Sequence, residues 1–150
     1  MDITIYTNGY SVKVDDDRKS GCAIVLSTSD QYNRVANREI GVATNNMTKA
    51  QAELNAIRIA LLSIKRIYES TADIVLYCSA NILKQYLNNG GAKHQEICAE
   101  INVLKEKFKS VHIKKFIPSD KNVDVCKELA KKCAEDQLDY DSYTRVELNQ

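Results

Sequence analysis

One acidic side chain stands where a buried helical face is expected. Residues 48–54 open a helical pattern in which Glu53 shares a face with the apolar Ile57, Ala60 and Ile64. A carboxylate on an apolar face is costly to bury unless a metal ion, a cationic side chain or hydrogen-bond donors meet it. The groups that meet Glu53 therefore decide which chemistry this chain can carry out.

The composition is that of a single globular domain. The chain has 150 residues, of which 44% are hydrophobic and 27% charged, enough to bury a core. No run approaches the roughly 18 apolar residues of a membrane span, and the first residues lack the features of a signal peptide. We therefore expect an intracellular, cytoplasmic protein with no membrane partner.

The five cysteines do not form a metal-binding pattern. They are odd in number and scattered, no two are spaced as C-x-x-C, and only two histidines accompany them. A scattered set of this kind in a reducing compartment is typical of small buried side chains. We expect all five thiols to be buried and free.

Charge is distributed unevenly along the chain. The net charge is +1, but residues after 133 carry five acids and one arginine, which leaves +5 on the rest. Such a segment is usually solvated. The sequence thus predicts a domain at residues 1–136 and an acidic C-terminal tail at 137–150.

Hydrophobic periodicity predicts a mixed α/β order. Three consecutive strands at residues 2–7, 21–26 and 34–42 imply an antiparallel meander, and Thr48 with Gln51 forms a capping box that opens a helix running to about residue 68. A strand at 74–78, helices near 82–87 and 97–108, a strand at 111–117 and a helix at 125–133 follow. This order fits a five-stranded mixed sheet, three antiparallel strands then parallel βα units, flanked by helices.

Five short segments mark the ends of these elements. They are Ile5-Tyr6-Thr7-Asn8-Gly9 at the end of the first strand, Gly21-Cys22-Ala23-Ile24-Val25, Thr48 to Leu54, Leu76-Tyr77-Cys78-Ser79-Ala80-Asn81 and Cys126-Lys127-Glu128-Leu129-Ala130. In order and spacing they resemble the T-D-G, G-x-G-x-V, T-N-N-x-A-E-L, T-D-S-x and A-D-x-L-A motifs of the type 1 ribonuclease H family. The resemblance spans most of residues 2–134 and implies a ribonuclease H-like fold.

The same resemblance implies a specific reaction. In that family four carboxylates hold two magnesium ions, and the RNA strand of an RNA/DNA hybrid is cut. The four positions fall here on Asn8, Glu53, Ser79 and Lys127, of which Glu53 alone is acidic. Because Mg²⁺ prefers anionic oxygens, we expect a degenerate site with no metal cofactor. We expect Lys127 to pair with Glu53 instead, with Asn8 and Ser79 supplying hydrogen bonds.

Two functions remain open at this point. The first is binding, without hydrolysis, of nucleic acid (an RNA/DNA hybrid or structured RNA), of a protein partner or of a second copy. Gly9, Thr48, Lys49 and Asn81 are then the candidate nucleic-acid contacts, since Lys49 stands at a helix N-terminus that favours phosphate. The alternative is an active ribonuclease H with a noncanonical or mutated acid set, using Mg²⁺ or Mn²⁺. Asp124, nearly on the helical face of Lys127, would then replace the fourth acid.

Overall fold

The computed structural model describes residues 1–29 and 34–147. In chain order the elements are β1 (Asp2–Val14), β2 (Asp17–Ser29), β3 (Arg34–Asn45), α1 (Lys49–Leu62), the 3-10 helix η1 (Arg66–Tyr68), β4 (Asp73–Cys78), α2 (Ala80–Leu87), α3 (Gln95–Lys105), β5 (Ser110–Lys115), α4 (Lys121–Asp136) and β6 (Tyr140–Glu147). The predicted α/β order is confirmed up to α4. None of the described helices is long and apolar enough to cross a bilayer.

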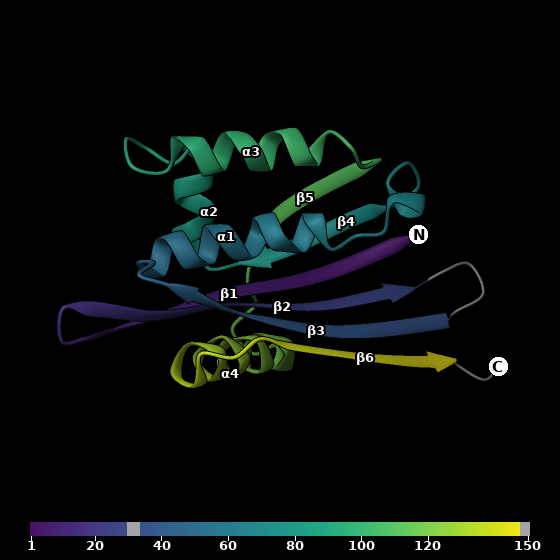
Figure 1. Cartoon of the computed structure of the whole chain (residues 1–150). Coiled ribbons are helices and arrows are strands. Elements are labelled where there is room, and N and C mark those ends of the chain that lie inside the picture. Colours follow the sequence, from purple (N-terminus) through teal and green to yellow (C-terminus); the bar gives the residue numbers. More distant parts are fainter. Residues whose placement is uncertain (30–33, 148–150) are drawn as a thin grey trace.

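All strands join one mixed sheet in the order β5-β4-β1-β2-β3-β6 (Figure 1). β1, β2 and β3 form an antiparallel meander, while β1 pairs with β4, and β4 with β5, in parallel. The predicted fold class is therefore confirmed. The predicted number of strands was one too few.

The additional strand comes from the segment predicted to be an acidic tail. β6 pairs antiparallel with β3, from Gly41 opposite Tyr140 to Arg34 opposite Glu147. The Arg38 guanidinium donates to both carboxylate oxygens of Asp141, at 3.0 and 2.8 Å, and the Ala43 amide donates to Asp139. Its acids therefore bind the edge of the sheet. Sequence reasoning missed this strand because it is polar and is held mainly by the backbone of a distant strand.

The largest shifts of predicted boundaries are in β1 and α1. β1 does not end near Gly9 but continues to Val14, because it keeps pairing with β2 after its parallel pairing with β4 stops at Tyr6 and Tyr77. The helix predicted to reach residue 68 ends at Leu62, and a separate 3-10 turn follows. Its predicted capping box is confirmed, with the Thr48 hydroxyl accepting from the Gln51 amide at 3.3 Å.

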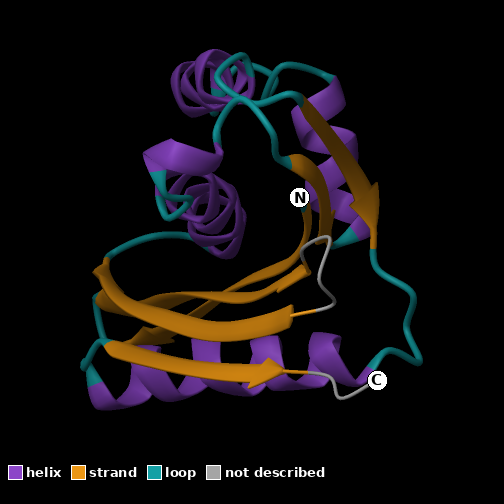
Figure 2. Cartoon of the chain, turned by 90° about the vertical axis from the view of Figure 1, so that its right-hand side faces the viewer, coloured by secondary structure: helices purple, strands orange, loops and turns teal. Residues whose placement is uncertain are grey.

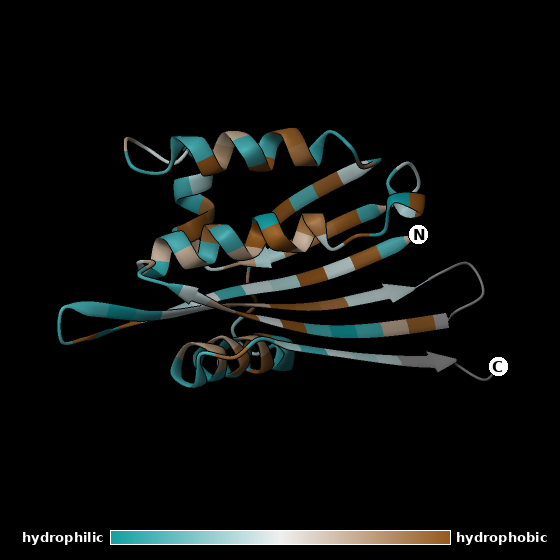
Figure 3. Ribbon diagram, viewed as in Figure 1, coloured by the Kyte–Doolittle hydropathy of each residue, from teal (hydrophilic) through white to brown (hydrophobic). Residues whose placement is uncertain are grey.

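Helices cover both faces of the sheet. α1 and α3 lie on one face and α4 lies on the other, as Figure 2 shows from the side. The larger core cluster packs between α1, α3 and the sheet, around Ile5, Leu54 and Ile74, and apolar residues recur along these elements in Figure 3. A second cluster packs α4 against β1 and β2. All five cysteines are buried and free, as predicted.

One contact brings α1 directly onto the central strand. A Cβ atom added to Gly9 would lie 2.4 Å from the backbone nitrogen of Glu53 and 2.8 Å from the Cβ of Ala52. Only a glycine leaves room for this approach. The contact places the first turns of α1, and Glu53 with them, against β1.

We expect Gly9→Ala to destabilise the fold by about 1–3 kcal/mol, because the added methyl group overpacks a backbone contact that cannot yield easily. Urea unfolding followed by circular dichroism measures the effect. Gly91→Asn is the control, since nothing lies within 4 Å of a Cβ there and asparagine tolerates its positive φ of 58°. A Gly9→Ala protein as stable as the natural chain would contradict the proposed constraint.

Candidate functional site

The site lies where the parallel pairing of β1 and β4 stops. Tyr6 and Tyr77 form the last parallel pair. Asn8 and Ser79 each follow two residues further along their chain segments. Gly9 holds the start of α1 against the same place. Glu53 and Ser79, 26 residues apart in the sequence, are joined here by a hydrogen bond, and Asn8 lies beside them at the end of the parallel pairing of β1.

Ser79 carries two hydrogen bonds in this cluster. Its hydroxyl donates to Oε2 of Glu53 at 3.3 Å and accepts from the backbone amide of Ile82 at 3.2 Å. The second bond makes Ser79 the N-cap of α2. One hydroxyl thus satisfies part of a buried carboxylate and one of the free amides at a helix start.

Burial dominates the electrostatics of the cluster. Asn8 and Glu53 are each only 5% exposed. Burial raises the pKa of Glu53 above its ordinary value, while Lys49, the Ser79 hydroxyl and Lys127 offset part of this effect. Burial, reinforced by the nearby Glu53, also raises the pKa of the Cys78 thiol to about 12. At neutral pH this thiol is protonated and is a poor nucleophile.

The predicted ion pair between Lys127 and Glu53 does not form. Within the described ranges, no ion pair of 4.0 Å or shorter includes Glu53. Lys127 is exposed on α4, which covers the opposite face of the sheet from α1, so its charge reaches Glu53 only at longer range. Lys49, on the same helix as Glu53, has the larger influence on its pKa.

Asp124 also points elsewhere. It lines a surface groove with Glu39 and Tyr140, between α4 and β6. It is not among the groups that shift the pKa of Glu53. The structure therefore does not bring the possible substitute acid to the cluster.

The four predicted nucleic-acid contacts surround the cluster in different ways. Gly9 is buried beneath α1, Thr48 caps α1, and Lys49 and Asn81 are exposed in the first turns of α1 and α2. Thr48 also lines an open groove of about 840 Å³ that runs to the loop between α2 and α3. That groove contains Gln85, Asn88, Lys93 and His94, which sequence reasoning did not select.

A tyrosine that sequence reasoning overlooked attaches the start of α4 to β1. The Tyr6 hydroxyl donates to Oδ2 of Asp120 at 2.5 Å, and its ring stacks on Tyr77 with centroids 5.1 Å apart. Asp120 caps α4 by accepting from the Asn122 amide at 2.9 Å. Burial and the bond to Asp120 raise the pKa of Tyr6 to about 12. The sequence signal that could have indicated this contact is Asp120, a typical N-cap residue that follows Pro118 and begins α4.

The donor set at the cluster does not suit the two divalent ions that the fold family implies. Asn8 and Ser79 offer an amide and a hydroxyl, and Glu53 offers the single carboxylate. Over residues 1–29 and 34–147, no three His, Cys, Asp or Glu side chains gather in a group fit to hold a metal ion. Magnesium sites normally use anionic oxygens and dehydrate the ion reluctantly. The charges that act on Glu53 are those of two lysines, Lys49 and Lys127, rather than further carboxylates.

Comparison with known proteins defines the class of this fold. No family profile and no curated protein matches the chain by sequence. Among solved structures, RNase H1 from the halophilic archaeon Halobacterium salinarum matches with a TM-score of 0.71 and 18% identity, over 92% of this chain and all of that one. The chain therefore has a ribonuclease H-like fold.

Two further structures are similar. LC9-RNase H1, a type 1 RNase H with the type 2 active-site motif, matches with a TM-score of 0.75 and 11% identity, over 97% of this chain and 77% of that one. LC11-RNase H1, solved in complex with an RNA/DNA hybrid, matches with a TM-score of 0.68 and 19% identity, over 90% and 98%. At these identities the similarity establishes the fold alone.

Replacing Ser79 tests its double role. We expect Ser79→Ala to lower the free energy of unfolding by about 1 kcal/mol, since the N-cap of α2 is lost together with a donor to Glu53. Chemical unfolding at neutral pH measures this change. Ser79→Thr is the matched control because it keeps the hydroxyl, and an equal loss in both variants would contradict the assignment.

The raised pKa of Glu53 predicts a pH-dependent effect of Glu53→Gln. The folded protein holds the Glu53 proton more tightly than the unfolded chain, so this residue makes stability fall as pH rises from about its ordinary pKa through the folded value. The slope from one proton is at most about 1.4 kcal/mol per pH unit.

We therefore expect Glu53→Gln to be more stable than the natural chain at pH 8, with a difference that shrinks toward pH 4. Urea midpoints across that range provide the measurement. Glu106→Gln is the control variant, because the Glu106 side chain is exposed rather than buried. A constant difference for Glu53→Gln would refute the predicted shift.

Proposed function

We propose that this ribonuclease H-like domain binds nucleic acid through the strand-end cluster without metal-dependent hydrolysis. The observation that carries the proposal is the composition of the cluster. It has one buried carboxylate, beside Asn8 and Ser79, and the charges of two lysines partly offset the rise in the pKa of that carboxylate. Its Coulomb field favours an anion more than a pair of divalent cations.

The lysines supply the attraction to a phosphate backbone. Lys49 and Lys127 are exposed, approach the cluster from opposite faces of the sheet, and both lower the pKa of Glu53. Lysine side chains and backbone amides at helix starts are common contacts to phosphate oxygens. The first turn of α1, with Thr48 beside Lys49, presents both.

The neighbouring groove gives a bound duplex room to continue. It extends from Thr48 to Lys93 and His94, and polar residues and glycines predominate among the residues that line it. LC11-RNase H1 has been solved with an RNA/DNA hybrid, which makes a hybrid the first substrate to test on this chain. We propose further that the chain uses no metal cofactor, since binding of this kind requires neither Mg²⁺ nor Mn²⁺.

Fluorescence anisotropy with a labelled RNA/DNA hybrid tests the proposal. We expect binding that is unchanged when EDTA replaces Mg²⁺ and that weakens steeply with salt. Lys49→Gln with Lys127→Gln should reduce the slope of log affinity against log salt by about 2, since each lost phosphate contact contributes about 1.

Lys132→Gln is the control for these variants. Lys132 is on the same helix as Lys127, but its ammonium lies 5.6 Å from the ring centroid of Tyr140, toward β6. Three results would overturn the proposal: no binding to the hybrid at low salt, an equal loss of affinity in the control, or metal-dependent cleavage of the hybrid that Glu53→Ala abolishes. The last would favour an active ribonuclease H.

A further inference from the structure

A separate pocket lies at the far end of α1. It has a volume of about 230 Å³ and is enclosed by β1, β2, β3, β6 and the turn that follows α1. Its walls are mainly apolar and aromatic, and they include Ile3, Leu26, Val35, Ile64, Tyr68 and Tyr143. β6, which lies in the segment predicted to be a tail, thus forms one wall of this pocket through Tyr143.

This pocket is not part of the strand-end cluster. Glu53 is near the start of α1, whereas Ser63, the C-cap of the helix, lines the pocket. Ten residues of α-helix separate them by about 15 Å. An occupant of the pocket would therefore leave the cluster free.

Its size favours one large side chain over a cofactor. Pockets that hold drug-sized ligands usually measure about 300–1,000 Å³, larger than this one. A single aromatic side chain is a common anchor of protein interfaces. The small volume therefore favours one inserted anchor residue over a larger ligand.

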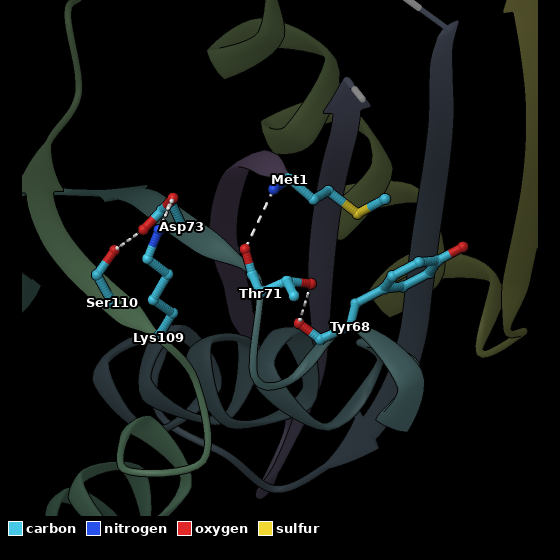
Figure 4. Close-up of polar contacts among 6 residues, drawn as sticks. All are labelled: Met1, Tyr68, Thr71, Asp73, Lys109 and Ser110. Atoms are coloured by element: carbon cyan, nitrogen blue, oxygen red, sulfur yellow. Dashed lines mark hydrogen bonds and ion pairs between the residues drawn. The ribbon is translucent and has the colours of Figure 1, made fainter. Parts of the chain in front are cut away.

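An exposed aromatic side chain borders the pocket. Tyr143 lines it and is 62% exposed, and the neighbouring segment between Leu62 and Ile67 carries two further exposed apolar residues, at 53% and 76%. Figure 4 shows Met1 and Tyr68 extending their side chains to the same side, away from the polar contacts of Asp73 with Lys109 and Ser110. Exposed apolar groups around a hollow mark surfaces that contact other proteins.

The charges at the pocket favour an acidic partner. Two cations line it, Arg38 and Lys65. Asp141 neutralises Arg38 through two hydrogen bonds. Lys65 is exposed and, in the part of the chain that the structure describes, belongs to no ion pair within 4.0 Å. A carboxylate beside the anchor would find a partner in Lys65.

We propose that this pocket receives one aromatic or large aliphatic side chain of a partner protein, on a segment whose adjacent acidic residue pairs with Lys65. The site adds a protein-docking surface to the proposed nucleic-acid contact. The two surfaces lie at opposite ends of α1, so this chain can bind a nucleic acid and a protein partner at the same time.

The chain contains no tryptophan, which makes a tryptophan peptide a clean probe. We titrate acetyl-Asp-Trp-Asp-amide with the full chain and follow tryptophan emission. We expect saturable binding with a Kd on the order of a millimolar or below, accompanied by a blue shift as the indole leaves water. Acetyl-Asn-Trp-Asn-amide should bind about fivefold more weakly because it lacks the carboxylates.

Substitutions on the chain localise the binding. Tyr143→Ser and Lys65→Glu should each weaken the acidic peptide about fivefold or more, and Ala36→Leu should abolish binding by filling the pocket. Tyr140→Ser is the matched control, because Tyr140 belongs to the same strand but lies under Lys132. Thermal unfolding checks that each variant is folded.

Several results would overturn the proposal. They are the absence of saturable binding, equal binding by the pocket variants and the control, and binding of decanoate but not of the peptide, which would assign the pocket to a free amphipathic carboxylate. Hybrid binding provides an independent readout, since Tyr143→Ser and Lys65→Glu should leave it unchanged. Failure of the peptide to bind is thus distinguishable from failure of the nucleic-acid proposal.

Discussion

The close approach of α1 to β1 at Gly9 is the constraint on which the site depends. With no side chain at that position, the backbone nitrogen of Glu53 comes within the space that a Cβ would occupy. The first turns of α1 are thereby packed on the central strand, and the Glu53 carboxylate is buried with them. Its burial raises its pKa, and Ser79 provides a hydrogen bond that limits the cost.

Desolvation and long-range charge oppose each other at this carboxylate. Water is largely excluded, which disfavours the ionised form, while Lys49 and Lys127 favour it without touching it. Because both lysines stay in solvent, neither is desolvated as it would be in a buried ion pair. They also remain free to meet a phosphate, which links the electrostatics of the cluster to the function proposed for it.

α1 separates two surfaces of different chemistry. Its N-terminal end presents a helix start, a hydroxyl cap and a lysine beside the buried cluster. Its C-terminal end borders a small apolar pocket closed on the other side by β6. The rigid helix and the continuous sheet hold these surfaces apart, so the two can act independently.

Much of this arrangement follows from local sequence patterns. Apolar periodicity and the capping box at Thr48 predicted α1 because they depend on residues within a few positions of one another. The strand-end motifs singled out Glu53 and Ser79, which the structure joins by a hydrogen bond between α1 and the end of β4. The odd number and scattered spacing of the five cysteines predicted buried, free thiols, and all five are found so.

Tertiary structure alone decided the rest. The pairing of β6 with β3, and the bond of Tyr6 to Asp120 across 114 residues, arise from polar groups whose sequence carries no periodic signal. Lys127 fails to pair with Glu53 because the sheet separates the faces that α4 and α1 cover. Residue types and spacing thus indicated that Glu53 and Ser79 come together, which the hydrogen bond between them bears out. The distances and solvent exposure that set their interactions depended on how distant elements pack.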